Sequence, residues 1–270
     1  MSPLTLLPLL AALPLSVGPV AELKRGQQAF WAGQYDKAAR TLTGLPPRLP
    51  RTRDYALYLG GESEFYAGRP ARARALFALL AAERDSRFAP MAPWRVADCL
   101  WAEGRKPEAV AAYRRLLAAP APGADVDLVV AKFRVAQLAA PAEADKLFRQ
   151  IHGEHPAHPL AAEAARRAGP DASPRQSPGG DPRARLRRAG LLVGGRHVEE
   201  AIAELEALPA ALPPDLAAER DFALGMAKFR TRHDYPAAAE LLLRVAPRLV
   251  RIEQEDIFVS SSSSMRSRFS

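Results

Sequence analysis

The chain has 270 residues, 48% of them hydrophobic and 25% charged, so it can bury a core as one elongated domain or two compact ones. Its single cysteine, Cys99, excludes an intramolecular disulfide and a cysteine metal cluster, and its apolar neighbours at helical spacing predict a buried side chain. The net charge of +8 favours acidic partners, but no compact basic run with interleaved aromatic residues is present, which argues against nucleic-acid binding.

Residues 1–21 are apolar, carry no charged side chain and contain four prolines. A membrane-spanning helix would not tolerate so many prolines, so we expect no integral membrane span here. The segment is interpreted as a signal peptide, although no Lys or Arg precedes its apolar run. A wrongly assigned start codon or a cytosolic apolar N-terminal segment is the alternative.

A repeated alanine organises the chain from residue 22 onward. Aligning the chain on this alanine gives intervals of 35, 36, 35, 57 and 37 residues, and the residue four positions later is always large and apolar. The six alanines are Ala38, Ala73, Ala109, Ala144, Ala201 and Ala238, and the large residues are Leu42, Phe77, Tyr113, Phe148, Leu205 and Leu242.

A period of about 34 residues without any two-residue alternation predicts an all-α protein, an α-solenoid of tetratricopeptide-like helical hairpins in a right-handed superhelix. The alanine lets two antiparallel helices approach closely, and the large residue fills the groove one turn later. A glycine is expected to supply the left-handed turn that ends the first helix. Proline then falls in the first turn of the second helix, at Pro70, Pro107, Pro141 and Pro236.

The interval of 57 residues marks an interruption in the repeats. We expect residues 22–168 to form one stack of repeats and residues 182–249 to form further helical hairpins. The segment 169–181 between them is rich in Pro, Gly and Ser, which is typical of a flexible linker. Residues 250–270 contain five consecutive serines and no partner for the preceding helix, so they are expected to be a disordered or truncated tail.

Several stretches resemble the N-terminal superhelical region of soluble lytic murein transglycosylases. The stretches are YLGGESEFYAGRPARARALFALL, APWRVADCLWAEGRKPEAVAAYRRLL, HPAHPLAAEAARR, LEALPAALPPDLAAERDFALGMAKF and RHDYPAAAELLLRVAPRL. In that family the superhelix precedes a lysozyme-like domain that cleaves peptidoglycan glycan strands in the periplasm. The resemblance implies a periplasmic protein of the same pathway, without the catalytic domain.

No catalytic residue and no cofactor are predicted. Glu62 precedes Ser63, as in the Glu-Ser pair of that family's active site, but it lies inside a helical repeat and lacks the residues that follow in the family motif. His152, His155 and His158 lie three residues apart, a spacing that prolines interrupt and that differs from the usual helical metal motif. We therefore assign no metal site and do not expect an enzyme.

The predicted function is a noncatalytic helical-repeat scaffold that binds peptidoglycan or takes part in cell-wall remodelling. The alternative is a freestanding periplasmic scaffold that binds proteins of envelope assembly or division. The concave groove of such a superhelix is lined mainly by the first helices of the hairpins. Candidate contact residues on those helices are Arg95, Lys132, Arg134 and Lys228.

Overall fold

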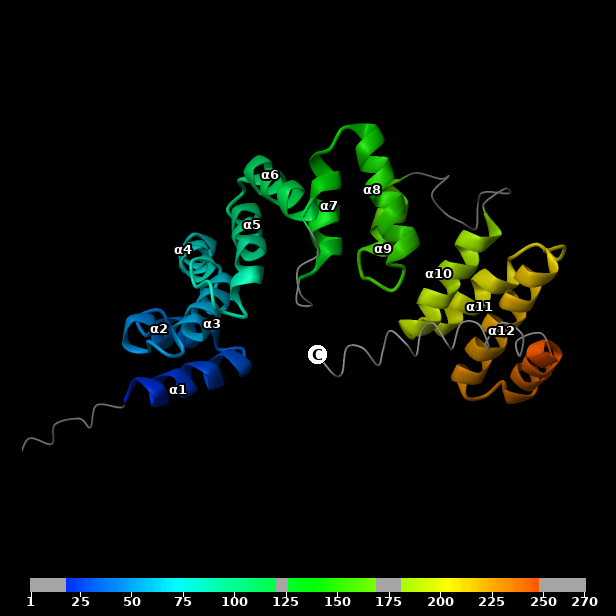
Figure 1. Cartoon of the computed structure of the whole chain (residues 1–270), viewed down its shortest axis with the longest axis horizontal. Helices are drawn as coiled ribbons and strands as arrows, with labels where there is room; N and C mark the ends of the chain where they lie inside the picture. Colours follow the sequence, from blue (N-terminus) through cyan, green and yellow to red (C-terminus); the bar gives the residue numbers. More distant parts are fainter. Residues whose placement is uncertain (1–17, 120–125, 169–180, 248–270) are drawn as a thin grey trace, which may run out of the picture. The chain divides into compact units, whose positions relative to one another are not determined.

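The computed structural model describes residues 18–119, 126–168 and 181–247, and within these ranges every regular element is helical (Figure 1). The predicted all-α class is therefore confirmed. The α-helices are α1 (Pro19–Trp31), α2 (Tyr35–Leu42), α3 (Arg53–Tyr66), α4 (Pro70–Ala81), α5 (Ala92–Ala102), α6 (Lys106–Leu117), α7 (Leu128–Leu138), α8 (Pro141–Glu154), α9 (Ala161–Arg167), α10 (Pro182–Gly194), α11 (Val198–Glu206) and α12 (Pro214–Thr231). Residues 235–247 are also helical.

Within three runs of helices, each helix packs mainly on its neighbours in sequence, which is the contact pattern of an α-solenoid. The chain divides into two compact units, Met1–Val126 and Asp127–Ser270, called unit 1 and unit 2 below. In unit 1 the contacts run without interruption from α1 to α6, and α1 also contacts α3. In unit 2 they run from α7 to α9 and from α10 to α12.

The predicted segments 1–21, 169–181 and 250–270 can be compared with the observed helices and units. Helix α1 begins at Pro19, so the last residues of the apolar segment 1–21 belong to the first hairpin. Helix α10 packs on α8, so helices from both sides of the predicted linker 169–181 share unit 2. The linker itself, except Asp181, and the tail 250–270 lie outside the described residues.

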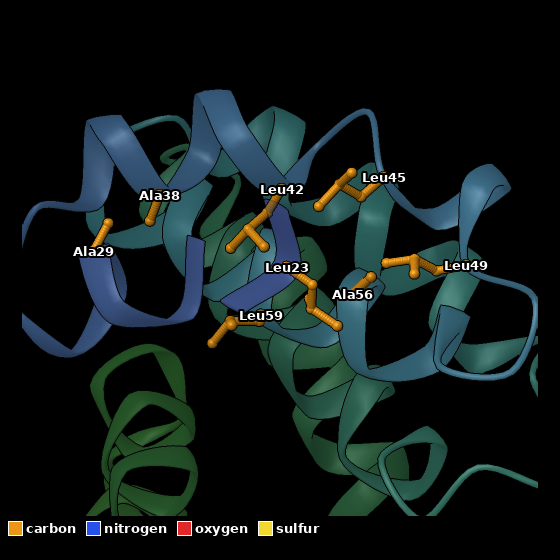
Figure 2. Close-up of a cluster of buried hydrophobic side chains, with 8 residues drawn as sticks. All are labelled: Leu23, Ala29, Ala38, Leu42, Leu45, Leu49, Ala56 and Leu59. Atoms are coloured by element: carbon orange, nitrogen blue, oxygen red, sulfur yellow. The ribbon is translucent and has the colours of Figure 1, made fainter. Parts of the chain in front are cut away.

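The repeated alanines lie where the two helices of a hairpin meet. Five of the six are buried, and Ala144 is half-buried. The large residues four positions later are also buried, except Leu242, which is half-buried. Figure 2 shows this arrangement in the first hairpin, where Ala38 and Leu42 of α2 share a cluster with Leu23 and Ala29 of α1 and with Leu59 of α3.

In the first two hairpins, the large residue that follows the repeated alanine packs against a glycine of the first helix. A methyl group added to Gly26 would lie 2.4 Å from Leu42, and one added to Gly61 would lie 2.7 Å from the Phe77 ring. The fourth hairpin has Lys132 at the corresponding position, and there Phe148 packs edge-to-face on Phe133, with ring centroids 5.3 Å apart. In the first two hairpins the close helix approach therefore uses two small residues, of which only the alanine was predicted from the sequence.

The turns inside the hairpins of unit 1 have the predicted glycine. Gly33, Gly68 and Gly104 have φ angles of 71°, 75° and 79°, in the left-handed region. The amide of the next residue donates to a carbonyl five residues earlier, as Gln34 does to Ala29 at 2.9 Å. This is the hydrogen bond of a Schellman motif, in which glycine avoids the cost of a left-handed side chain.

Unit 2 contradicts the glycine prediction. Arg196 and Arg232 hold the left-handed positions, with φ angles of 67° and 65°, and His197 donates to the Leu192 carbonyl at 2.9 Å in the same motif. Gly195 precedes Arg196 but adopts a φ of −79° as the C-cap of α10. A left-handed arginine costs about 1 kcal/mol or more relative to glycine, so unit 2 makes the same turn at a higher conformational energy.

Candidate binding surfaces

Arg95, the first predicted groove residue, is enclosed in an ion-pair network of unit 1. Its Nε lies 2.6 Å from Glu62 Oε1, its Nη2 lies 2.8 Å from Glu62 Oε2, and its Nη1 lies 2.6 Å from Asp98 Oδ2. The guanidinium also lies over the Phe65 ring, 4.4 Å from the centroid. Arg95 of α5 therefore links α5 to α3 through its ion pair with Glu62, and its charge is balanced by Glu62 and Asp98.

The other three predicted groove residues lie in unit 2 and are also engaged. Lys228 Nζ lies 3.1 Å from Asp234 Oδ2 and 3.3 Å from Glu206 Oε1, and the Asp234 hydrogen bond raises the pKa of the lysine. Lys132 Nζ lies 3.9 Å from Glu154 Oε2. Arg134 is half-buried and also has an interaction partner. A groove-binding role for these four cations stays a prediction.

Glu62 is buried and does not resemble a working general acid. Burial raises the pKa of its carboxyl group, which is a property that acid catalysis uses. However, both carboxylate oxygens are held by the Arg95 guanidinium, and the side chain is only 8% exposed. The geometry makes Glu62 the buried half of an interhelix ion pair.

Cys99 and the three histidines complete the list of chemistry-bearing candidates. Cys99 is buried as predicted, and burial raises its pKa to about 12, which keeps the thiol protonated at neutral pH. His158 Nε2 lies 3.1 Å from Asp127 Oδ2, whereas His152 is buried, with neither ring nitrogen hydrogen-bonded. No group of three His, Cys, Asp or Glu side chains in the described ranges is arranged to hold a metal ion.

Four aromatic side chains, two half-buried and two exposed, gather at one end of the first hairpin of unit 1. We call Phe30, Trp31, Tyr35 and Tyr66 the aromatic patch. Trp31 is 73% exposed and Tyr66 is 54% exposed. The Tyr35 and Tyr66 rings stack with centroids 5.1 Å apart, and Phe30 meets Trp31 edge-to-face at 5.3 Å.

A hollow of about 480 Å³ opens beside the aromatic patch. Tyr35 and Tyr66 form its apolar side, and Lys37, Arg40 and Asp36 are among its polar lining. Asp36 is paired with Arg69 at 2.5 Å, so Lys37 and Arg40 contribute the positive charge. Exposed aromatic residues beside cations are typical of surfaces that bind a partner.

A second hollow, of about 850 Å³, lies in unit 2 at the turns after α10 and α12. We call it the arginine hollow. Its lining combines two exposed aromatic rings, Phe229 and Tyr235, whose centroids are 5.5 Å apart, with the left-handed Arg196 and Arg232. The complete lining is Gly194, Arg196, Val198, Glu199, Phe229, Arg230, Thr231, Arg232 and Tyr235.

Neither surface was predicted from the sequence, although adjacent aromatic residues indicate the aromatic patch. Phe30 and Trp31, like Phe65 and Tyr66, are neighbouring aromatic residues at the end of a helix. Neighbouring residues on a helix point about 100° apart, so only one member of each pair can face the hairpin core. In the second pair Phe65 packs against the core of unit 1, whereas Tyr66 lies on the surface.

The protein was also compared with known proteins. No protein-family model matches the chain, and no curated protein matches it. Among solved structures it is similar to the TPR2AB domain of yeast Sti1 in complex with pHSP90, at 17% identity and a TM-score of 0.35, over 92% of this chain and 95% of that one. It is also similar to Acl4, an assembly chaperone of RpL4, at 15% identity and a TM-score of 0.29, over 89% of this chain and 99% of that one.

The description as a tetratricopeptide-like α-solenoid rests on the chain's own repeats and on the order of its helix contacts. None of the described helices is long and apolar enough to cross a membrane.

Proposed function

We propose that this protein is a noncatalytic helical-repeat scaffold that binds peptidoglycan in the periplasm through the aromatic patch of unit 1. The observation that carries the proposal is the exposure of Trp31 and Tyr66 next to a hollow with two cations. Burying aromatic rings of this size would contribute strongly to binding a partner. The cell-wall setting and the periplasmic location come from the sequence resemblance alone.

Peptidoglycan has the chemistry that this surface would recognise. Sugar rings present flat apolar faces that stack on Trp and Tyr side chains, and the lactyl and peptide parts carry carboxylates. Lys37 and Arg40 lie in the same hollow and would attract those carboxylates. The net charge of +8 favours association with such an acidic polymer at low salt.

The direct test is cosedimentation of the purified protein with protein-free sacculi. Wild type is expected to pellet at low salt, and the Trp31→Ala/Tyr66→Ala variant is expected to stay in the supernatant. Leu79→Ala is the matched control, because Leu79 is 49% exposed on α4 and lies outside the patch. Equal pelleting of wild type and the double variant would refute the assigned surface.

The same experiment examines the noncatalytic role. Incubation with sacculi is expected to release no anhydro-muropeptides, and their release would show that the protein is an enzyme.

The second candidate is a freestanding scaffold that binds an envelope protein through the same patch. Exposed Trp and Tyr side chains are also the residues most enriched at protein–protein hot spots. Sacculi that retain their attached proteins separate the two candidates. Pelleting with these sacculi but not with protein-free sacculi would favour the protein scaffold.

A further inference from the structure

The arginine hollow of unit 2 has features that the fold alone does not require. The left-handed turn position is glycine in all three hairpins of unit 1 that the structure describes, and in unit 2 it is Arg196 after α10 and Arg232 after α12, while the turn after α7 has no left-handed residue. Glycine makes this turn without steric cost. A residue that strains the backbone and could be replaced by glycine is a candidate for a functional role.

The two arginines are also electrostatically unusual. In the described ranges of unit 2, neither Arg196 nor Arg232 makes an ion pair or a side-chain hydrogen bond. The turn arginines of unit 1 are paired instead: Arg69 with Asp36 at 2.5 Å, and Arg105 with Glu108 at 2.7 Å. The two left-handed arginines are thus available for an anion from outside the chain.

Both side chains line one hollow together with a third arginine. Arg230 donates to the Val193 carbonyl at 2.7 Å and keeps its positive charge, while Glu199 is the carboxylate of the lining. Three arginines and one glutamate give a net charge of +2 around the hollow. A dianion would balance this charge, whereas a single carboxylate would leave half of it uncompensated.

The geometry points to a phosphate monoester carried by an aromatic group, and we propose such a ligand for the arginine hollow. A phosphate monoester has a charge of about −1.5 to −2 and three acceptor oxygens, enough for two guanidinium forks, whereas one fork already satisfies a carboxylate. The Phe229 and Tyr235 rings form the wall against which the aromatic group packs. The volume of about 850 Å³ suits a small ligand or a modified side chain. This proposal does not depend on peptidoglycan binding by unit 1.

Isothermal titration calorimetry of the full chain with three probes tests the site. Phenyl phosphate represents a phosphorylated tyrosine side chain, adenosine 5′-monophosphate represents a nucleotide, and inorganic phosphate lacks the aromatic group. At least one aromatic phosphate is expected to bind ten-fold or more tightly than inorganic phosphate. The tighter of the two aromatic probes identifies the source of the ligand.

Glycine variants separate a binding role from a structural one. Arg196→Gly and Arg232→Gly are each expected to weaken binding ten-fold or more and to raise the melting temperature by a few degrees, because the turn loses its strain. Arg187→Ala is the control, since Arg187 is an exposed arginine of α10 outside the hollow. Its affinity should equal that of wild type.

Three results would overturn the proposal. The first is absence of saturable binding of both aromatic phosphates to wild type. The second is equal affinity for inorganic and aromatic phosphates, which would remove the role of the rings. The third is unchanged affinity in both glycine variants.

Discussion

Unit 1 and unit 2 use similar hairpin cores but different residues in the turns. In both units a buried alanine and a large residue four positions later hold the helices together, as Ala73 with Phe77 and Ala201 with Leu205 do. The hairpin turns of unit 1 have glycine in the left-handed position, whereas the turns after α10 and α12 in unit 2 have Arg196 and Arg232. The comparison teaches that the core specifies the hairpin, while the turn is free to carry a binding residue at a modest energetic cost.

The largest expected effect concerns the buried ion pair that joins two hairpins of unit 1. Arg95→Ala would leave Glu62 buried without its partner, so we expect a loss of about 3–5 kcal/mol in the free energy of unfolding. Urea unfolding followed by tryptophan fluorescence measures this loss in unit 1, because Trp31, Trp94 and Trp101 are the three tryptophans of the chain.

Two controls accompany the Arg95 variant. Arg187→Ala removes an exposed arginine and should change stability by less than about 0.5 kcal/mol. The variant Glu62→Leu/Arg95→Leu removes both charges and should regain much of the loss. A loss below about 1 kcal/mol in Arg95→Ala would contradict the structural role assigned to this pair.

Unit 2 contains a histidine with a large expected effect on stability below neutral pH. Burial, with the nearby Arg188 charge as a second cause, lowers the pKa of His152 to about 4 from the ordinary value of 6.5. Between these values the unfolded chain binds more protons than the folded chain, so stability is lost as the pH falls. The loss from this histidine is about 3 kcal/mol between pH 7 and pH 4.

Urea unfolding of the full chain followed by circular dichroism at several pH values measures this loss. In His152→Leu the loss of stability between pH 7 and pH 4 should be about 3 kcal/mol smaller than in wild type, and the remaining loss includes that of His155, whose pKa burial also lowers. Stability at pH 7 should not fall by much, because neither ring nitrogen of His152 is hydrogen-bonded. An identical pH profile in wild type and His152→Leu would show that His152 is not the responsible group.

The third effect concerns the close helix approach at the core of unit 1. The methyl group of Gly61→Ala would lie 2.7 Å from the Phe77 ring, so we expect a destabilisation of about 1–3 kcal/mol. Gly190→Ala in α10 is the matched control, since no atom lies within 4 Å of its added methyl group. It should stabilise the protein by about 0.5–1 kcal/mol through helix propensity. Chemical unfolding of both variants should therefore give shifts of opposite sign, and a stabilised Gly61→Ala would contradict the packing.

The sequence predicted the hairpins well because their determinants are local and repeated. Ala38, Ala73 and Ala109 recur at nearly constant spacing, and each is buried against its neighbouring helix. The ion-pair partners of the candidate groove cations could not be predicted in the same way. Arg95 is neutralised by Glu62, which lies 33 residues away in sequence, and the packing of α4 on both α3 and α5 brings the two together.

The turn residues of unit 2 show a second reason for failure. Gly194 and Gly195 precede Arg196, so a prediction based on glycine alone places the left-handed residue one position too early. Composition identifies a turn but does not fix its register within one residue. The arginine hollow depends on which turn residue is left-handed, so it could not be predicted from the sequence.

The most direct test of the contrast between the units is a turn exchange measured by thermal unfolding. Gly68→Ala in unit 1 should lower stability by about 1 kcal/mol, since its φ of 75° disfavours any side chain. Arg196→Gly in unit 2 should raise stability by about the same amount. A loss of stability in Arg196→Gly would contradict the claim that unit 2 retains a strained arginine where glycine would serve the fold better.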